Sequence, residues 1–271
     1  MIRFVSFNIN GIRARQHQLE AVRDIIDPDV MGIQETKVHD EQFPLQDVES
    51  LGYHVEYFGQ KAHYGVALVS KVKPIFVQKG FPGESEEAQK RFIHARYIFD
   101  DKEIDVLNGY YPQGESRDHE IKFPMKRDYY ASLNEYVDQL KEEGRTLIIM
   151  GDMNIAPEDN DIGIGEKNAQ RWLKNGKTSF LPEEREWYSA LMSRDLFDTY
   201  RIHNPDCNEK FSWFDYRSRG FNDDPKRGLR IDHILCTDDI KDQCIDAGIS
   251  YELRAMEKPS DHAPIWASFK F

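Results

Sequence analysis

The sequence predicts an α/β fold, a four-layered sandwich in which two packed mixed β-sheets are flanked by helices. Three observations support this prediction. Strand-like apolar runs far outnumber helical stretches, many of them follow one another without a helix between them, and apolar residues are numerous enough for a large core. Consecutive strands disfavour a purely parallel, doubly wound sheet. Two stacked sheets with helices outside them bury all the apolar faces instead.

Nine short segments are predicted to be strands, because each is an apolar run bounded by turn residues. In chain order they span residues 2–9, 29–34, 53–58, 65–70, 92–99, 104–111, 146–150, 229–236 and 263–269. Apolar side chains recur at three- and four-residue steps over residues 14–26 and 121–142, which predicts helices there. A further helix is predicted over 182–193, where Pro182 suits the first turn and the acidic residues after it suit the positive end of the helix.

The chain shows no internal boundary. No Ser-, Gly- or Pro-rich linker divides the 271 residues, and no segment repeats at a fixed period. We therefore expect a single domain over residues 1–271. The stretch 155–178 is rich in Asp, Gly and Asn, and we expect it to be a long functional loop.

Composition excludes several classes of protein. Hydrophobic residues make up 39% of the chain and charged residues 31%, which is typical of a globular protein and not of a disordered one. No apolar run is long enough to span a bilayer and no cleavable signal begins the chain, so no membrane partner is expected. Cys207, Cys236 and Cys244 form no C-x-x-C pair, which disfavours structural zinc and fits a reducing compartment. The expected location is the cytoplasm.

The net charge of −12 argues against a nucleic-acid partner, because phosphate binding needs positive charge. The positive charges are distributed unevenly, however, and two segments gather them. These are residues 117–127, with Arg117, Lys122, Lys126 and Arg127, and residues 210–230, with Lys210, Arg217, Arg219, Lys226, Arg227 and Arg230. The sequence therefore leaves open the possibility of a local basic surface on an otherwise acidic protein.

Polar side chains occur at the ends of the predicted strands. Asp152 and Asn154 directly follow the run 146–150, and residues two apart in extended chain point to one face. The other candidates are Asn8, Asn10, Glu35, Asn108, Tyr110, Asp232, Asp261 and His262. Each alone has a plainer interpretation: an Asp or Asn after a strand is usually a turn residue, Glu35 could be solvated, His262 structural and Tyr110 part of the core.

Convergence of these strand ends would change the interpretation. Glu35, Asp152, Asp232 and Asp261 would then form an acidic cluster, in which two carboxylates about 4 Å apart repel by roughly 4 kcal/mol at an effective dielectric near 20. A metal cation or a protonated histidine must offset that repulsion. An all-oxygen site suits Mg²⁺, or Mn²⁺ as a substitute, and the chemistry expected of it is metal-assisted hydrolysis of a phosphoester.

Several motifs carry a family resemblance that covers nearly the whole chain. Asn8–Gly11, Gln34–Thr36, Gly109–Pro112, Gly151–Asn154, Ile231–Asp232 and Ser260–His262 occur in the order and spacing of the endonuclease/exonuclease/phosphatase superfamily. The longer segments 109–119, 179–187, 211–217 and 256–264 resemble the exonuclease III family of bacteria, the apurinic/apyrimidinic endonucleases of base-excision repair. One departure is His233, where that family commonly has an apolar residue. We interpret it as variation beside the site and not as a second catalytic histidine.

The resemblance implies a role for each candidate. It implies a metal site at Glu35, with Asn8, Asp152, Asn154 and Asp261 as further ligands or neighbours that order them. Asp152 would deprotonate the attacking water with help from Asn154. His262, oriented by Asp232, would face the scissile phosphate, and Tyr110 would bind the phosphate or assist the leaving group. Gln113 and Lys122, in the segment after Tyr110, are expected to contact the DNA backbone.

The catalytic motifs alone do not select a substrate, since this superfamily also includes phosphatases of lipids and small phosphoesters. Trp213 and Phe214 are adjacent aromatics with Arg217 close behind, a pattern that suits either core packing or a wedge against unstacked bases with a phosphate clamp. The resemblance favours the wedge. An abasic nucleotide also has no base to unpair, so flipping it out costs less than flipping out an intact one.

The expected function is therefore that of a Mg²⁺-dependent repair nuclease. It would cleave double-stranded DNA 5′ to abasic sites and act on 3′ ends as exonuclease and phosphatase, as a monomer. Two alternatives remain: a catalytically silent nucleic-acid regulator on the same scaffold, and a phosphatase of lipids or small phosphoesters. The intact acidic and histidine set disfavours the first, and the polar segment 212–219, where a lipid enzyme would carry an apolar loop, disfavours the second.

Overall fold

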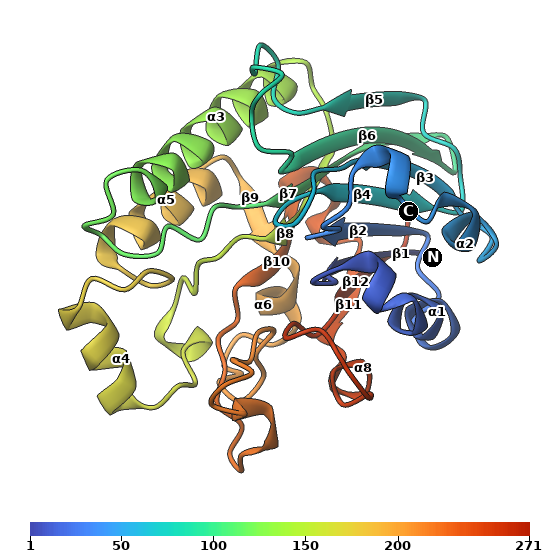
Figure 1. The fold of residues 1–271 in the computed structure, drawn as a ribbon. Helices are drawn as coiled ribbons and strands as arrows, with labels where there is room; N and C mark the ends of the chain where they lie inside the picture. The colour runs from blue at the N-terminus through green and yellow to red at the C-terminus, as the bar shows by residue number, and fades with distance from the viewer.

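Twelve strands form two six-stranded sheets in the computed structural model, which describes all residues 1–271 (Figure 1). The first sheet has the order β11-β12-β1-β2-β4-β3 and the second β5-β6-β7-β8-β10-β9. In chain order the strands are β1 (Ile2–Asn8), β2 (Val30–Gln34), β3 (His54–Phe58), β4 (Val66–Ser70), β5 (Phe76–Lys79), β6 (Phe92–Phe99), β7 (Lys102–Tyr110), β8 (Leu147–Asp152), β9 (Leu196–Asp198), β10 (Asp232–Thr237), β11 (Cys244–Ile249) and β12 (Ile265–Phe269).

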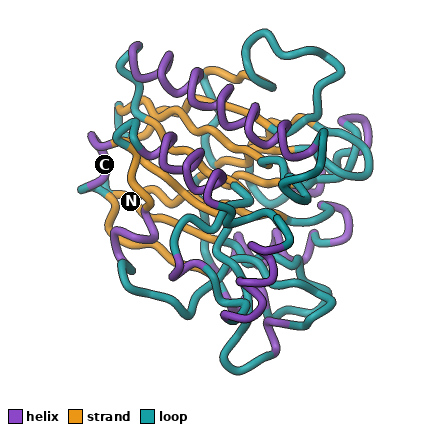
Figure 2. Tube along the Cα trace, turned by 90° about the vertical axis from the view of Figure 1, so that its left-hand side faces the viewer, coloured by secondary structure: helices purple, strands orange, loops and turns teal.

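Helices cover the outer face of each sheet, so the molecule has four layers (Figures 1 and 2). The α-helices are α1 (Gln16–Ile25), α2 (Leu45–Glu49), α3 (Lys122–Glu142), α4 (Glu166–Lys174), α5 (Pro182–Met192), α6 (Thr199–His203), α7 (Asp238–Lys241) and α8 (Tyr251–Arg254). One buried cluster, which includes Phe4, Leu68 and Val106, lies between the sheets. A second cluster packs α3 and α5 on the second sheet, and a third packs α1 and α2 on the first. The predicted four-layered sandwich is confirmed.

Each sheet contains one parallel pair, and this pairing positions the polar strand ends. β1 runs parallel to β2, with Asn8 beside Gln34, and β7 runs parallel to β8, with Tyr110 beside Asp152. β10 runs antiparallel to β8, so that its first residue, Asp232, lies opposite Asp152. Because parallel strands end at the same edge, the polar residues after them are brought to one edge of both sheets.

A buried amide fastens the two sheets together near that edge. Asn108 on β7 donates to the backbone oxygens of Ile33 (3.1 Å) and Ala67 (2.9 Å) in the other sheet, and accepts from the Gln34 amide at 2.6 Å. Buried polar groups satisfied in this way specify one arrangement of the elements that they join. The relative position of the strand ends is therefore set by side chains as well as by the apolar core.

The structure contains elements that the sequence analysis did not predict, among them the short helices α2, α6, α7 and α8. Strands β5, β9 and β11 were not predicted, because they are short or exposed edge segments without a clear apolar pattern. Helix α4 lies within the stretch 155–178 that the sequence predicted to be a loop. That helix is short and buries no residue fully, and its apolar residues, Ala169, Trp172 and Leu173, are too few to mark it within a stretch rich in Asp, Gly and Asn.

None of the helices, the 21-residue α3 included, combines the length and the apolarity that crossing a bilayer requires.

Candidate active site

The strand ends open into a cavity of about 340 Å³. Most of the residues that the sequence singled out face it. The residues that line it are Glu35, Tyr110, Gln113, Asp152, Asn154, Trp172, Lys177, Ser179, Trp213, Asp215, Arg217, Ile231, Asp261 and His262. Asn8 and Asp232 lie directly behind this lining, in hydrogen-bond contact with Asp152 and His262 respectively.

The backbone around Asp152 is unusually constrained. Gly151 has φ +152°, and a Cβ there would lie 2.0 Å from the backbone oxygen of Gly109, its neighbour on β7. Only glycine permits this close approach, which brings Asp152 beside Tyr110. Asn154 and Glu35, each just beyond a strand, both have φ +53°. Left-handed backbone at residues other than glycine costs roughly 1–3 kcal/mol and clusters at functional sites.

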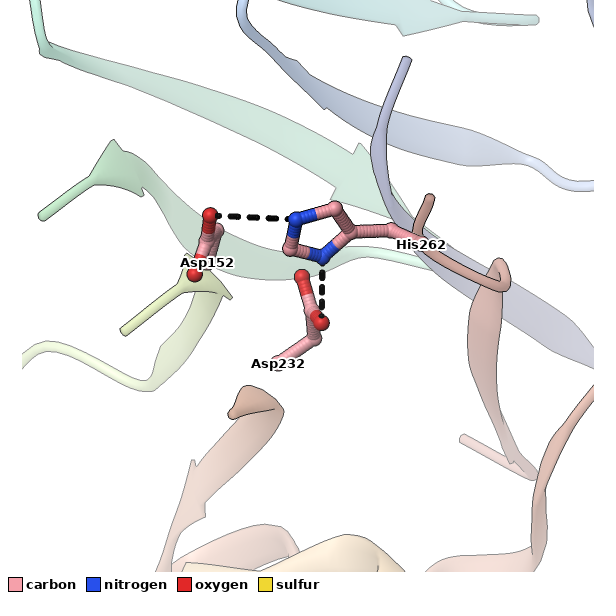
Figure 3. A group of neighbouring side chains, drawn as sticks. All are labelled: Asp152, Asp232 and His262. Atoms are coloured by element: carbon pink, nitrogen blue, oxygen red, sulfur yellow. Dashed lines mark hydrogen bonds and ion pairs between the residues drawn. The ribbon is translucent and has the colours of Figure 1, made fainter. Parts of the chain in front are cut away.

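His262 lies between two buried carboxylates (Figure 3). Its Nδ1 is 2.8 Å from Asp232 Oδ2 and its Nε2 is 3.7 Å from Asp152 Oδ2. Burial alone would lower the pKa of the imidazole, but the charges of Asp232 and Asp152 outweigh it and raise that pKa to about 10. The ring is therefore cationic at neutral pH, with Nε2 directed at Asp152 on the cavity wall. It is 4% exposed, which fits a group at the floor of the cavity.

Asp152 and Tyr110 are also perturbed by their surroundings. Burial raises the pKa of Asp152 above its usual range, while the His262 cation opposes that rise. Burial and the negative charges of Glu35 and Asp152 raise the pKa of Tyr110 well above 10, so its phenol stays protonated. The cavity thus combines a carboxylate that readily takes up a proton with a phenol that keeps one. Such pairs of shifted groups are typical of acid–base sites.

Asn8 links the two carboxylates expected near a metal. Its amide donates to Glu35 Oε1 at 2.9 Å and to Asp152 Oδ2 at 2.8 Å. On the far side of Glu35, the ammonium of Lys37 is 2.9 Å from Oε2. Lys37 also bonds to the side chain of Asn10, and the Asn10 amide donates to Asp261 at 2.8 Å. The sequence argument left Lys37 out and gave Asn10 no role, although Asn10 lies in the quoted segment Asn8–Gly11 and Lys37 directly follows Gln34–Thr36.

The donor set around Glu35 fits a hard divalent cation. The carboxylates of Glu35 and Asp152 are brought together by the Asn8 amide nitrogen, which donates to both, and carboxylate oxygens are the ligands that Mg²⁺ or Mn²⁺ prefers. Asp152, Asp232 and His262 also offer ligand atoms within 4.8 Å of one another. A protonated imidazole has no free lone pair, however, so His262 cannot be a metal ligand in this state. Its positive charge instead offsets the negative charges of Asp152 and Asp232. These acidic residues could therefore hold a metal ion, and the Glu35 side of the cluster suits the ion better.

Asp261 and Trp213 are joined at the cavity rim. The indole Nε1 of Trp213 donates to Asp261 Oδ2 at 3.1 Å, and the backbone of Trp213 forms bridges with Leu229 and His262. Trp213 is half-buried and lines the cavity. Its ring is therefore held at the site by the sheet edge below it and by Asp261 beside it.

One sequence-based assignment of a DNA-contacting residue is wrong. Phe214 is completely buried and packs edge-on against Phe211, Phe221 and Tyr251, so its ring is core and cannot act as a wedge. The alternation of backbone bridges turns Trp213 toward the cavity and its neighbour away from it.

The basic face that the sequence analysis left open has fewer free cations than the residue count suggests. Lys126 and Arg230 are buried and ion-paired, with Glu184 and with Asp161 respectively. Arg117 pairs with Glu183, and Lys122 pairs with Glu115 at 2.5 Å while staying exposed. Arg217 is exposed and lines the cavity as predicted.

Helix α4 and the turn after it supply residues that the sequence argument missed. The ammonium of Lys177 lies 3.6 Å from the centroid of the Trp172 ring, which in turn stacks on Phe180 at 5.6 Å and 8°. Both Lys177 and Trp172 line the cavity. Arg91 is a further missed cation, held between the rings of Tyr64 (4.3 Å) and Tyr110 (4.7 Å). No local motif marks these residues, because tertiary contacts alone bring them to the site.

A second hollow continues from the cavity. It measures about 360 Å³ and shares Glu35, Tyr110 and Gln113 with the first. Its other charged or titratable lining is mainly basic and consists of Lys37, His63, Arg91, His119 and Lys122. Positive charge thus gathers beside the acidic centre, despite the net charge of −12.

His233 lies outside the cavity, as the sequence interpretation expected. It is completely buried, and its Nε2 is 2.8 Å from the backbone oxygen of Ile155. A carbonyl oxygen only accepts, so Nε2 carries a proton, and Nδ1 can then accept from Arg230 at 3.1 Å. The imidazole holds the chain just after Asn154 and has no access to substrate.

Comparison with known proteins agrees with this geometry. The profile of the family described as Endonuclease/Exonuclease/phosphatase matches residues 5–262. Exodeoxyribonuclease III of Haemophilus influenzae is 56% identical over 269 residues, which is 99% of this chain and 100% of that protein. A 3′ phosphatase from Neisseria, solved with a product DNA hairpin, has TM-score 0.89 and 33% identity with 100% of both chains covered. An AP endonuclease from Archaeoglobus fulgidus has TM-score 0.89 and 32% identity, also with 100% of both chains covered.

Proposed function

The chain belongs to the endonuclease/exonuclease/phosphatase family and is a DNA-repair nuclease, and we propose that it cleaves the phosphodiester 5′ to abasic sites in double-stranded DNA. We propose that the same cavity removes 3′ phosphates and trims 3′ ends. The arrangement of Asp152, His262 and Asp232 carries this proposal, because it sets a proton acceptor beside a buried cation at the floor of an open cavity.

In the proposed mechanism, Asp152 takes a proton from the attacking water. Its raised pKa makes it a better base than an ordinary carboxylate. The backbone N–H of Asn154 donates to Asp152 Oδ1 at 3.2 Å, which orients the carboxylate. The Asn154 amide is held by the oxygen of Tyr111 at 2.9 Å, so its own carbonyl oxygen is left to accept from the water.

The cationic His262 is proposed to stabilise the charge that builds up on the phosphate. A preoriented cation in a desolvated site is worth far more than one in water. Tyr110, kept protonated, donates to a phosphate oxygen or to the leaving group. A divalent ion bound at Glu35, for which we propose Mg²⁺, would supply further neutralisation of the phosphate charge.

The substrate is proposed to be DNA on account of the charges and rings around the cavity. Lys177, Arg217 and the basic lining of the second hollow can follow a phosphate backbone. Gln113 and Lys122 lie between the two hollows and along the second one. Trp213 presents an aromatic ring at the rim of the cavity, and this ring can stack in the gap that a missing base leaves.

Selectivity for abasic sites follows from the cost of extrusion. The cavity holds about 340 Å³, so a nucleotide must leave the duplex to reach Asp152. A nucleotide without a base has no stacking or pairing to lose, which saves a few kcal/mol. A 3′ end frays for a similar reason, and this accounts for the action at ends proposed above.

The test is incision of a duplex that carries one synthetic abasic site, with and without EDTA. We expect a single cut 5′ to the site that EDTA abolishes and added Mg²⁺ restores. A silent regulator would bind this duplex without cutting it. A phosphatase of lipids or small phosphoesters would leave it intact and hydrolyse a phosphoinositide headgroup instead.

We further infer a monomer that works in the cytoplasm. The three cysteines are all free, which suits a reducing compartment. A sedimentation measurement that gave the mass of two chains would contradict the monomer.

Replacing Glu35 by glutamine is expected to raise the Mg²⁺ concentration for half-maximal activity by about 10- to 100-fold, the usual scale for weakening a metal site. The change removes one negative charge and keeps an acceptor for Asn8. Titration with Mg²⁺ at saturating duplex measures it, with Glu183→Gln as the control, because Glu183 pairs with Arg117 and does not line the cavity. An unaltered titration would exclude Glu35 as a ligand.

Replacing Lys177 by methionine is expected to weaken binding of all duplexes alike and to reduce the slope of log K against log salt by about 1, because one phosphate contact is lost. Methionine keeps the chain packed on Trp172. Binding is measured at several salt concentrations with EDTA present. Lys174→Met on α4 is the control, since Lys174 is exposed and does not line the cavity. Equal slopes for the two variants would remove Lys177 from the interface.

A further inference from the structure

A buried ion pair lies behind the cavity wall. Lys126 on α3 and Glu184 on α5 are both completely buried, with Nζ 2.5 Å from Oε1. Burial lowers the pKa of Lys126 and the charge of Glu184 opposes that effect. Charged groups this deep are rare. A buried pair contributes little net stability because of its desolvation, and apolar replacements are often as stable. Its presence here therefore calls for another explanation.

Every hydrogen-bonding position of the Lys126 ammonium is used. Besides Glu184, it donates to the backbone oxygen of Asn154 at 2.8 Å and to that of Gln113 at 3.3 Å. An ammonium has three protons, so none is left over. The first of these oxygens belongs to the loop after β8 and the second to the segment after β7. One side chain therefore joins the two backbones that leave the parallel strands at the site.

Glu184 extends the connection to a third segment. Its Oε2 accepts from the backbone N–H groups of Ser179 at 2.8 Å and Leu181 at 2.9 Å. Ser179 lines the cavity together with Gln113 and Asn154. The Lys126–Glu184 pair thus touches three separate segments of the cavity wall from behind, and it makes no contact with the cavity itself.

The position of Asn154 depends most on this connection. Its backbone is left-handed, at φ +53°, a conformation that surrounding contacts must maintain. Neighbouring carbonyls are held in the same way, because the Tyr130 hydroxyl donates to the oxygen of Met153 at 2.8 Å and His233 holds that of Ile155. Only the bond to the oxygen of Asn154 comes from a group that also reaches the other walls.

We propose that Lys126, paired with Glu184, is a positioning residue for the hydrolytic reaction, which braces the segments carrying Gln113, Asn154 and Ser179 into one rigid wall. The inference deepens the proposed function and rests on it. Loss of the brace lets Asn154 drift, and its N–H then no longer aligns the Asp152 carboxylate. Misplacement of a catalytic group by about 1 Å costs on the order of 10²-fold in rate.

The test compares Lys126→Met with the double variant Lys126→Met/Glu184→Gln. The single variant leaves an unpaired buried carboxylate and is expected to lose both thermal stability and turnover. The double variant removes that charge, and glutamine at this position still accepts from the N–H groups at the start of α5. We expect its Tm to recover most of the loss. Its kcat is expected to stay about 10²-fold low with KM within about threefold of the native value.

The matched control is Lys141→Met. Lys141 is on the same helix and pairs with Asp195, far from the cavity lining. It is expected to keep the native kcat. If the double variant regains kcat together with Tm, the ion pair is merely structural and the proposal is overturned. The same holds if Lys126→Met loses stability without loss of kcat.

A second readout separates this proposal from the proposed function. Amide hydrogen exchange of residues 153–156 and 179–181 is measured in the absence of substrate. Faster exchange in the double variant than in the native protein and in Lys141→Met supports the brace, whatever the substrate proves to be. Unchanged exchange overturns it. Failure of the native protein to cut abasic duplex, in contrast, overturns the proposed function alone.

Discussion

Replacing Asp152 by asparagine is expected to lower turnover on abasic duplex by about 10²–10⁴-fold, the usual scale for removing a positioned base. Asparagine has the same shape and keeps one acceptor oxygen for the N–H of Asn154, whereas its NH2 group replaces the oxygen that accepts from the Asn8 amide. It cannot take up a proton. The wall of the cavity stays in place while the chemical step slows, so affinity for the duplex is expected to hold or to rise as a carboxylate facing phosphate is removed.

The measurement is a single-turnover rate at saturating enzyme, with binding determined separately in EDTA. Asp159→Asn serves as the control, because it makes the same change of charge on a side chain that is 93% exposed. A rate within a factor of about three of the native one would exclude a role as the base. A parallel loss of rate and of binding would assign Asp152 to substrate affinity instead.

The sequence predicted the site well where function depends on the ends of strands. The position of a residue directly after a buried strand is largely set by that strand, and parallel neighbours such as β7 and β8 end side by side. Asp152, Tyr110 and Glu35 could therefore be assigned together from motif order and local pattern. The family resemblance, and not the strand pattern, implied that Asp232 orients His262, and the two side chains are 2.8 Å apart.

The sequence could not predict the residues that reach the site by tertiary packing. Lys177 depends on α4, a short helix with no fully buried residue, and Arg91 depends on two rings that are distant in the chain. Two adjacent residues also differ in their exposure to the cavity. Trp213 faces the cavity and Phe214 is buried beneath it, a difference of one position in backbone pairing that no composition reveals.

Lys126 is a residue that the sequence suggested for the surface and that tertiary packing places in the interior. In the sequence it is one of four basic residues within eleven, which suggests a surface that binds phosphate. Its partner Glu184 lies 58 residues away, and only the packing of α3 against α5 brings them together. The positive charge of Lys126, which the sequence analysis counted toward a possible basic face, therefore lies inside the protein. Counting local charge overestimates a basic face wherever helices pack through ion pairs.

Replacing Asp232 by asparagine is expected to lower turnover at pH 8 by about 10²-fold, the scale for losing one electrostatic contact to a transition state. Asp232 is the largest of the influences that raise the pKa of His262. Without its charge, burial prevails and the imidazole loses its proton at a lower pH. The variant thus has a neutral ring at a pH where the native protein has a cation.

The pH dependence distinguishes this explanation from simple loss of structure. In the native protein the pKa of His262 is raised from 6.5 to about 10. The stabilisation that its cation contributes is therefore fully present below about 6.5 and is lost as the pH rises through about 10. Activity that needs the cation has its alkaline limit in the same range. In Asp232→Asn that limit is expected to move toward acid, so the ratio of native to variant rate should shrink as the pH is lowered from 8 to 6. The ratio at each pH is the quantity to measure. A ratio independent of pH would mean that Asp232 orients the ring without setting its charge.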